Sequence, residues 1–172
     1  MKKLVIAAAF MALGTFGTLG GLSAHAAEKV KVMETVKLAA PPATVWEKIG
    51  HFSDLSWHPA VKSTEASDGD KADSQRRLDL GGPILWEALV ANKPAARSYS
   101  YRILDNGSNQ KVLPVTGYVS TISVKPDGAG SEVVWSSTFV PTAGTTADAA
   151  HKAVAGVYRG GLDALAKGFA KN

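Results

Sequence analysis

The sequence contains no cysteine among its 172 residues. This absence excludes disulfide cross-links, a cysteine nucleophile, thiolate ligands for a metal ion and lipid attachment through an N-terminal cysteine. Small exported domains often depend on disulfides, so an exported chain of this composition must be held together by its core alone.

No unbroken apolar run reaches the roughly 20 residues that a membrane-spanning helix needs. Leu4 to Leu13 (LVIAAAFMAL) is a run of ten that follows Lys2 and Lys3 and precedes the small-residue site Ala24-His25-Ala26. This order is typical of a secretory signal peptide, so we predict that residues 1–26 are cleaved off after Ala26. The alternative is an uncleaved anchor, because Leu4 to Leu22 spans 19 residues if its glycines are counted as apolar.

Export changes the meaning of the charge balance. Removal of 26 of the 172 residues leaves 146, the size of one domain, with 17 basic against 15 acidic residues and a net charge of +2. With no basic cluster, no nucleic-acid partner is expected. We expect a bacterial periplasmic or secreted protein with no stable membrane anchor after cleavage.

Residue periodicity predicts the elements of this domain. Val and Lys alternate in a first strand over Glu28 to Leu38, Pro41-Pro42 is suited to start a short helix, and Phe52 to Pro59 to form a second helical turn. Thr145 or Thr146 can cap a long C-terminal helix, in which apolar residues recur at spacings of three and four. Further strands are expected at Val61 to Ser67, Ser74 to Leu80, Ile84 to Ala91, Arg97 to Leu104, Val115 to Val124 and Ser131 to Val140.

This order of elements predicts an α+β domain over residues 27–172. A curved antiparallel sheet of about seven strands wraps around the long C-terminal helix, and two short helices follow the first strand. No internal repeat or linker indicates a second domain.

Six short sequence words occur in one order along nearly the whole exported domain. They are Ala40 to Trp46 (APPATVW), Trp57 to Val61 (WHPAV), Trp86 to Leu89 (WEAL), Tyr99 to Tyr101 (YSY), Leu113 to Val115 (LPV) leading to Tyr118, and Val134 to Phe139 (VWSSTF). In this order they resemble the polyketide cyclase/dehydrase branch (SRPBCC proteins) of the START/Bet v 1-like superfamily. The resemblance implies a helix-grip fold that binds hydrophobic or amphipathic small molecules between sheet and helix, and only some members are enzymes.

The exported leader together with this branch is also similar to periplasmic MxaD-type proteins found with methanol-oxidation systems. That narrower resemblance implies an accessory role, with a periplasmic oxidoreductase or cytochrome as partner. Lysines on the outer face of the first strand could attract an acidic partner.

Aromatic residues carry the hypothesis of a ligand pocket. Strand alternation puts the rings at 99–101, 118 and 135–139 on the more apolar faces of their strands, which should point toward the helix. The same argument places Trp86, with Ile84 and Ala88, on the inward face of its strand. The alternative is that these rings only fill a core. The candidate ligand-binding residues are Glu34, Trp57, His58, Trp86, Tyr99, Tyr101, Tyr118, Trp135, Phe139 and Tyr158.

Two acidic residues need separate interpretations. Glu34 falls on the inward face of the first strand, where an ionised carboxylate needs a partner or water; Arg76, Arg77, Arg97, Arg102 or a tyrosine hydroxyl are candidate partners. The alternative is a bulge that turns Glu34 to solvent. Simple alternation with Trp86 places Glu87 on the outer face.

The histidines do not indicate a metal site. His51 and His58 lie seven residues apart across a loop, and His151 is expected to be exposed at the start of the last helix. His58, between Trp57 and Pro59, is interpreted as part of a pocket rim, either as an acid or base or only as a loop-packing residue. No nucleotide or cofactor motif is present, so no cofactor is expected.

Three functions follow from these observations. The first is a non-enzymatic binding protein for a small apolar or amphipathic molecule, and the second is the accessory role. The third is a cyclase- or dehydratase-like enzyme with Glu34, His58 or Tyr101 in acid/base roles.

Overall fold

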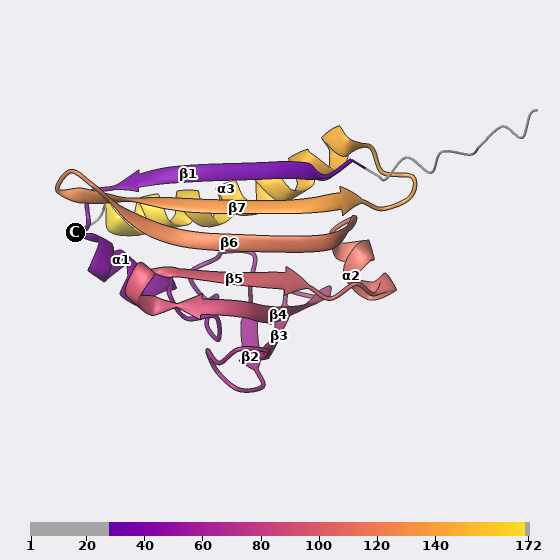
Figure 1. Cartoon of the computed structure of the whole chain (residues 1–172), viewed down its shortest axis with the longest axis horizontal. Helices are drawn as coiled ribbons and strands as arrows, with labels where there is room; N and C mark the ends of the chain where they lie inside the picture. Colours follow the sequence, from indigo (N-terminus) through magenta and orange to yellow (C-terminus); the bar gives the residue numbers. More distant parts are fainter. Residues whose placement is uncertain (1–27, 171–172) are drawn as a thin grey trace, which may run out of the picture.

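Seven antiparallel strands form one curved sheet in the order β1-β7-β6-β5-β4-β3-β2 (Figure 1). The computed structural model describes residues 28–170, so the predicted signal peptide lies outside the described residues. The first and last strands of the chain pair with each other, and β2 forms the opposite edge. The strands are β1 (Val30–Leu38), β2 (Ser63–Ala66), β3 (Gln75–Asp79), β4 (Ile84–Lys93), β5 (Ser98–Ile103), β6 (Val115–Asp127) and β7 (Gly130–Pro141).

Three α-helices accompany the sheet. They are α1 (Pro42–Ile49), α2 (Gly107–Val112) and the long C-terminal α3 (Ala147–Phe169); a short 3-10 turn, η1 (Pro94–Ala96), precedes β5. The predicted α+β helix-grip fold is confirmed. Within residues 28–170, none of the helices is both long and apolar enough to span a membrane.

The alternation predicted for the first strand determines how β1 lies. Val32 and Leu38 are buried while Lys31 and Met33 are exposed, as expected for a half-buried strand. At the other end of the chain, the Thr146 side chain accepts a hydrogen bond from the backbone N–H of Ala149 at 3.1 Å and caps α3. Both elements are therefore specified locally by the sequence.

Two segments differ in detail from the sequence expectations. Phe52 to Pro59 forms separate turns, each closed by a backbone bond such as that from the His58 N–H to the Leu55 carbonyl at 3.0 Å. The segment between the expected strands at 97–104 and 115–124 contains the short helix α2, which the sequence did not predict. Asn106 accepts a hydrogen bond from the Asn109 N–H at 2.8 Å, so it is a helix N-cap.

The core lies between the sheet and α3, which packs chiefly on β1 and, to a lesser extent, on β7 (Figure 1). Gly161 allows this close approach. A Cβ atom at this position would lie 2.6 Å from Cδ2 of His58 and 3.0 Å from Cζ3 of both Trp57 and Trp135. Gly161 therefore serves the packing of α3, whereas a Cβ atom at Gly160 would have no atom within 4 Å.

We predict opposite effects for two Gly→Ala changes in α3. Gly161→Ala should lower the free energy of unfolding by about 1–3 kcal/mol, because the rings that it meets are held in place and α3 must move outward. Gly156→Ala, where nothing lies within 4 Å, should raise it by about 0.5–1 kcal/mol through helix propensity. Urea unfolding of both variants measures the difference, and equal effects would contradict the packing role of Gly161.

Candidate functional site: an apolar cavity beside a buried ion pair

An internal cavity of about 180 Å³ lies between the sheet, the 55–61 segment and α3. Its walls are largely apolar, and its polar groups come from six side chains. The apolar wall consists of Leu55, Leu78, Leu80, Leu85, Ile103 and Leu113. The polar or aromatic wall consists of His58, Arg76, Glu87, Tyr101, Tyr118 and Trp135.

The cavity opens between the 58–61 segment, the end of α2 and the middle of α3. The lining residues at these places are partly or well exposed, whereas the rest of the wall is buried except for the partly exposed Leu80; they are Ala60, Val61, Val112 and Val157. Val157 retains 41% of its surface accessible. A small molecule can therefore reach the interior from this side.

Arg76 and Glu87 form a buried ion pair on the cavity wall. They lie directly opposite each other on β3 and β4, and Nε of Arg76 donates to Oε2 of Glu87 at 2.7 Å. Nη1 of Arg76 donates to the Phe52 carbonyl at 2.8 Å. Arg76 has no exposed side-chain surface, whereas Glu87 retains 4%. Both side chains line the cavity, and the carboxylate is the more accessible member of the pair.

The guanidinium of Arg76 is enclosed by aromatic rings. Its Cζ lies 4.3 Å from the centroid of Phe52 and 5.0 Å from that of Tyr101, distances at which a cation is attracted to a ring face. Nη2 has no hydrogen-bond partner among the described residues. Burial opposes the charge on Arg76, but the Glu87 carboxylate keeps its pKa above the ordinary value. Burial raises the pKa of Glu87, and Arg76 offsets part of that rise.

A chain of buried hydroxyls joins the cavity wall to α3. The Tyr118 and Tyr158 hydroxyls lie 2.5 Å apart, and Tyr158 lies 3.0 Å from Oγ of Ser120. Nε1 of Trp135 donates to both the Tyr101 hydroxyl at 3.0 Å and Ser120 Oγ at 3.1 Å. Burial raises the pKa of Tyr158 to about 12 and those of Tyr101 and Tyr118 well above their usual value of 10.0, so all three hydroxyls keep their protons at neutral pH.

His58 is fixed as a neutral imidazole. Its Nε2 lies 2.9 Å from the Val157 carbonyl, which can only accept, so Nε2 carries a proton and donates it. Its Nδ1 accepts from the Ala60 N–H at 3.2 Å and therefore carries no proton. Burial lowers its pKa, with the nearby charge of Arg76 contributing in the same direction and the bond to Val157 opposing it. Both ring nitrogens are occupied by the backbone, so His58 holds the 58–61 loop against α3 and presents its ring to the cavity.

Four of the predicted site residues line the cavity: His58, Tyr101, Tyr118 and Trp135. Four others are buried around it without lining it; they are Trp57, Tyr99, Phe139 and Tyr158. Tyr158 stacks on Trp135 with ring centroids 4.4 Å apart, and Phe139 stacks on Tyr118 at 6.0 Å. These rings therefore position the lining residues.

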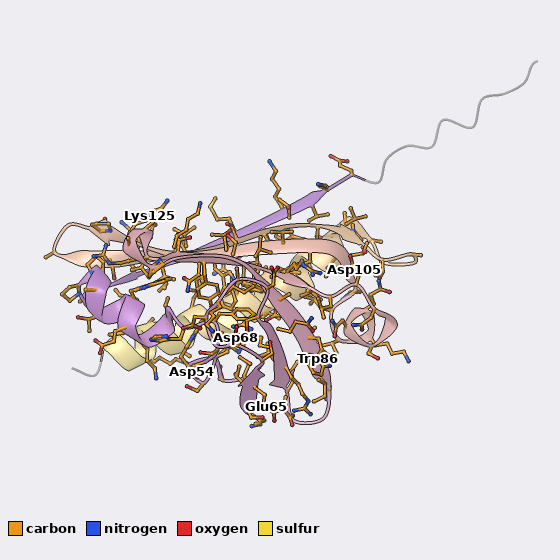
Figure 2. The ribbon with its side chains drawn as sticks, turned by 60° about the horizontal axis from the view of Figure 1, so that its bottom comes forward. Asp54, Glu65, Asp68, Trp86, Asp105 and Lys125 are labelled. Carbon is orange, nitrogen blue, oxygen red and sulfur yellow. The ribbon has the colours of Figure 1, made fainter. Side chains whose placement is uncertain are left out.

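The predicted orientation of β4 is wrong. Trp86 is 39% exposed on the outer face, whereas Glu87 is buried on the inner face with Leu85 and Leu89. Trp86 lies at the end of the sheet away from α3, near the strand that carries Glu65 (Figure 2). Trp86 was predicted to face inward only because it is apolar. Arg76 indicates the opposite orientation of β4, because it shares the apolar face of its strand with Leu78 and requires a buried anion opposite.

Glu34 faces inward, as the first of the two interpretations of the sequence predicted, but it does not line the cavity. Its carboxylate pairs with Nη2 of Arg159 on α3 at 2.5 Å, and 13% of its side chain is exposed. Arg159 was not among the predicted partners. Glu34 therefore joins β1 to the solvent edge of α3. The structure does not bring Glu34, His58 and Tyr101 together as an acid/base set.

His51 also finds a partner that the sequence did not indicate. Nδ1 of His51 lies 2.8 Å from Oδ2 of Asp70, so His51 is directed to that loop rather than to His58. No group of three His, Asp or Glu side chains within residues 28–170 is arranged to hold a metal ion.

The sheet order, the long C-terminal helix packed on the sheet and the cavity between them define a helix-grip domain. The family model described as polyketide cyclase / dehydrase and lipid transport matches residues 29–170, and the chain belongs to this family. No curated protein matches the chain.

Several solved structures are similar. The protein XoxI from Bacillus cereus is 30% identical, with a TM-score of 0.73 over 82% of this chain and 96% of that one. A protein from Thermobifida fusca is 28% identical, with a TM-score of 0.71 over 82% of this chain and 93% of that one. Ara h 8.0201 is 17% identical, with a TM-score of 0.66 over 84% of this chain and 100% of that one, and shows the shared fold alone.

We predict that His58 loses its proton at a lower pH than an ordinary histidine with a pKa of 6.5. Because the unfolded chain then binds the proton first, stability is fully present above pH 6.5 and is lost as pH falls from there toward the folded pKa. Urea unfolding across this range should show a steeper decline for the wild type than for His58→Gln. NMR titration of the ring gives the folded pKa, and a value at or above 6.5 would contradict the prediction.

We predict strong coupling between Arg76 and Glu87. Either Arg76→Met or Glu87→Met alone should lower the free energy of unfolding by about 3–5 kcal/mol, because the remaining charge is buried without its partner. The double variant should lose much less than the two effects combined. Arg77→Met is the matched control, because Arg77 on the same strand makes only a surface contact with Glu65 at 3.6 Å and should cost below about 1 kcal/mol. Additive single effects would contradict a coupled pair.

Proposed function

We propose that this protein binds a small apolar or amphipathic molecule in the cavity between its sheet and α3. The observation that carries the proposal is an apolar cavity of about 180 Å³ that remains in an otherwise closely packed core and opens beside Val157. A dry cavity of roughly 150 Å³ suffices to bind benzene. The ligand therefore has about the volume of a single substituted aromatic ring or a short branched chain.

The construction of the wall supports binding rather than empty space. Tyr101, Tyr118 and Trp135 are held by hydrogen bonds to one another or to Ser120 and Tyr158, so their rings cannot rotate freely to fill the cavity. Preformed pockets of this kind, mostly apolar with a few fixed polar groups, are typical of small-molecule sites. Membership of a family described as polyketide cyclase / dehydrase and lipid transport agrees with a small-molecule ligand.

The location that we propose is the bacterial periplasm or the exterior. The support is the order of lysines, apolar run and small-residue site in residues 1–26. After cleavage the domain would meet ligands on the outer side of the inner membrane. It has no cysteine and so needs no thiol chemistry there.

A second candidate is the accessory role toward a periplasmic dehydrogenase of the methanol-oxidising kind, or its cytochrome. One observation favours it: Lys31, Met33 and Val119 lie together on the outer sheet face, and Met33 is 65% exposed. A lysine beside apolar side chains suits an acidic protein surface. The cavity would then be secondary to this face.

We predict that xenon and toluene bind to the purified domain and perturb methyl NMR signals of the cavity wall. Val157→Phe should weaken toluene binding by at least about tenfold, because the larger side chain occupies the opening. Val119→Phe, a matched change at a residue 42% exposed on the outer face, should leave toluene binding unchanged.

The same two variants separate the candidate functions. Native mass spectrometry of protein purified from the periplasm should show a small ligand in the wild type and in Val119→Phe but not in Val157→Phe. If the wild type binds neither probe, the binding function is wrong. Co-purification of a dehydrogenase at low salt that Val119→Phe abolishes and Val157→Phe does not would favour the accessory role.

A further inference from the structure

The polar atoms of the cavity wall are assigned to partners within residues 28–170, with three exceptions: Nη2 of Arg76, the hydroxyl proton of Tyr101 and Oε1 of Glu87. This follows from the directions that the hydrogen bonds must take. Ser120 donates its hydroxyl proton to the Ser136 carbonyl at 3.0 Å, because a carbonyl can only accept. Ser120 must then accept from Tyr158, and Tyr158 in turn must accept from Tyr118. The protons of these three hydroxyls are therefore used within the protein.

Tyr101 differs from the other tyrosines of this network. Its oxygen accepts from Nε1 of Trp135 at 3.0 Å, yet no acceptor among the described residues takes its own proton. Tyr101 lies on the cavity wall and is 2% exposed. Its hydroxyl is thus a fixed donor without an acceptor, and the bond from Trp135 restricts where that donor lies.

Glu87 supplies the complementary acceptor. Its Oε2 is bound to Arg76, whereas Oε1 makes no hydrogen bond within residues 28–170. Arg76 also lines the cavity, but its side chain, including the unpartnered Nη2, has no accessible surface, so the carboxylate is the charge that a ligand meets first. Across the β4–β5 pair, Leu89 lies opposite Tyr101 and Glu87 lies opposite Ile103, which makes Glu87 and Tyr101 diagonal neighbours on one face. Both side chains line the same cavity, and in addition to burial the Glu87 carboxylate is near enough to raise the pKa of Tyr101.

We propose that the cavity selects a neutral, largely apolar molecule with one hydroxyl group, of the phenol or small-alcohol class, whose hydroxyl donates to Glu87 and accepts from Tyr101. This inference rests on the proposed binding function and adds the class of ligand. A hydroxyl is the smallest group that both donates and accepts. A carboxylate ligand would meet the Glu87 carboxylate with no accessible cation, and an ammonium would add a second cation to a pair that is already neutral.

Three probes of nearly equal size test the ligand class: toluene, anisole and p-cresol. Toluene forms no hydrogen bond, anisole only accepts one, and p-cresol, an isomer of anisole, both donates and accepts. Transfer of an unpaired hydroxyl from water into an apolar cavity is unfavourable, so a cavity without the Glu87–Tyr101 pair would bind toluene more tightly than p-cresol. We expect the reverse order, with p-cresol binding at least about tenfold more tightly than either of the other two by NMR titration.

Tyr101→Phe is the decisive variant. It removes the free donor but leaves Nε1 of Trp135 bonded to Ser120 at 3.1 Å, so no buried group loses its last partner. The advantage of p-cresol over toluene should fall by about tenfold, while toluene still binds. Tyr118→Phe is the control, because it removes a hydroxyl from the same wall whose proton is already directed to Tyr158. This control should keep the preference for p-cresol.

The outcomes separate the two proposals. If toluene binds as tightly as p-cresol, or if benzoate or benzylamine binds more tightly than p-cresol, the hydroxyl class is wrong and the binding function stands. If anisole equals p-cresol, the donation to Glu87 is wrong. If no probe binds to the wild type, the binding function fails, and this inference fails with it.

Discussion

Helix α3 covers only the β1–β7 end of the inner face of the sheet. The rest of the core depends on how the β3–β5 end of that same face is closed. α3 packs chiefly on β1 and to a lesser extent on β7, while the sheet continues through β6 to β2. The inner face of β3, β4 and β5 is therefore left to the turns over 52–61 and to large side chains. The cavity is the space that these groups do not fill. Its position is set by the width of the sheet relative to a single helix.

The closure is partly polar, which has an energetic consequence. A buried ion pair such as Arg76–Glu87 roughly offsets the free energy lost when both charges leave water, so it adds little net stability compared with well-packed apolar residues. Its measurable effect is to fix β3 against β4 at one register and to hold the Phe52 carbonyl through Nη1. The pair thereby positions the turn that closes the cavity. A purely apolar pair at these positions would pack but would present no polar atom to a ligand.

The sequence predicted the fold well because its elements are specified locally. Alternation in β1 and the Thr146 cap each indicate an element without long-range information. The site was predicted less well because it depends on pairing between strands. Trp86 and Glu87 could be assigned to the correct faces only with Arg76 known to lie opposite Glu87. Glu34 likewise found its partner, Arg159, on a helix more than a hundred residues away in the chain. Helix α2 was missed because Asn106 and Gly107 suit a turn as well as a helix start.

The helix and the cavity are connected through His58. Its ring donates to the Val157 carbonyl of α3, its Cδ2 limits the residue at Gly161, and its other face lines the cavity. Trp135 makes the same connection from the sheet, since it stacks on Tyr158 of α3 and donates to Tyr101 of the wall. A shift of α3 must therefore change the cavity opening at Val157 and the direction of the Tyr101 hydroxyl together. In this domain the shape of the cavity and its hydrogen-bonding pattern are set by the same contacts, so a ligand that fits one must satisfy the other.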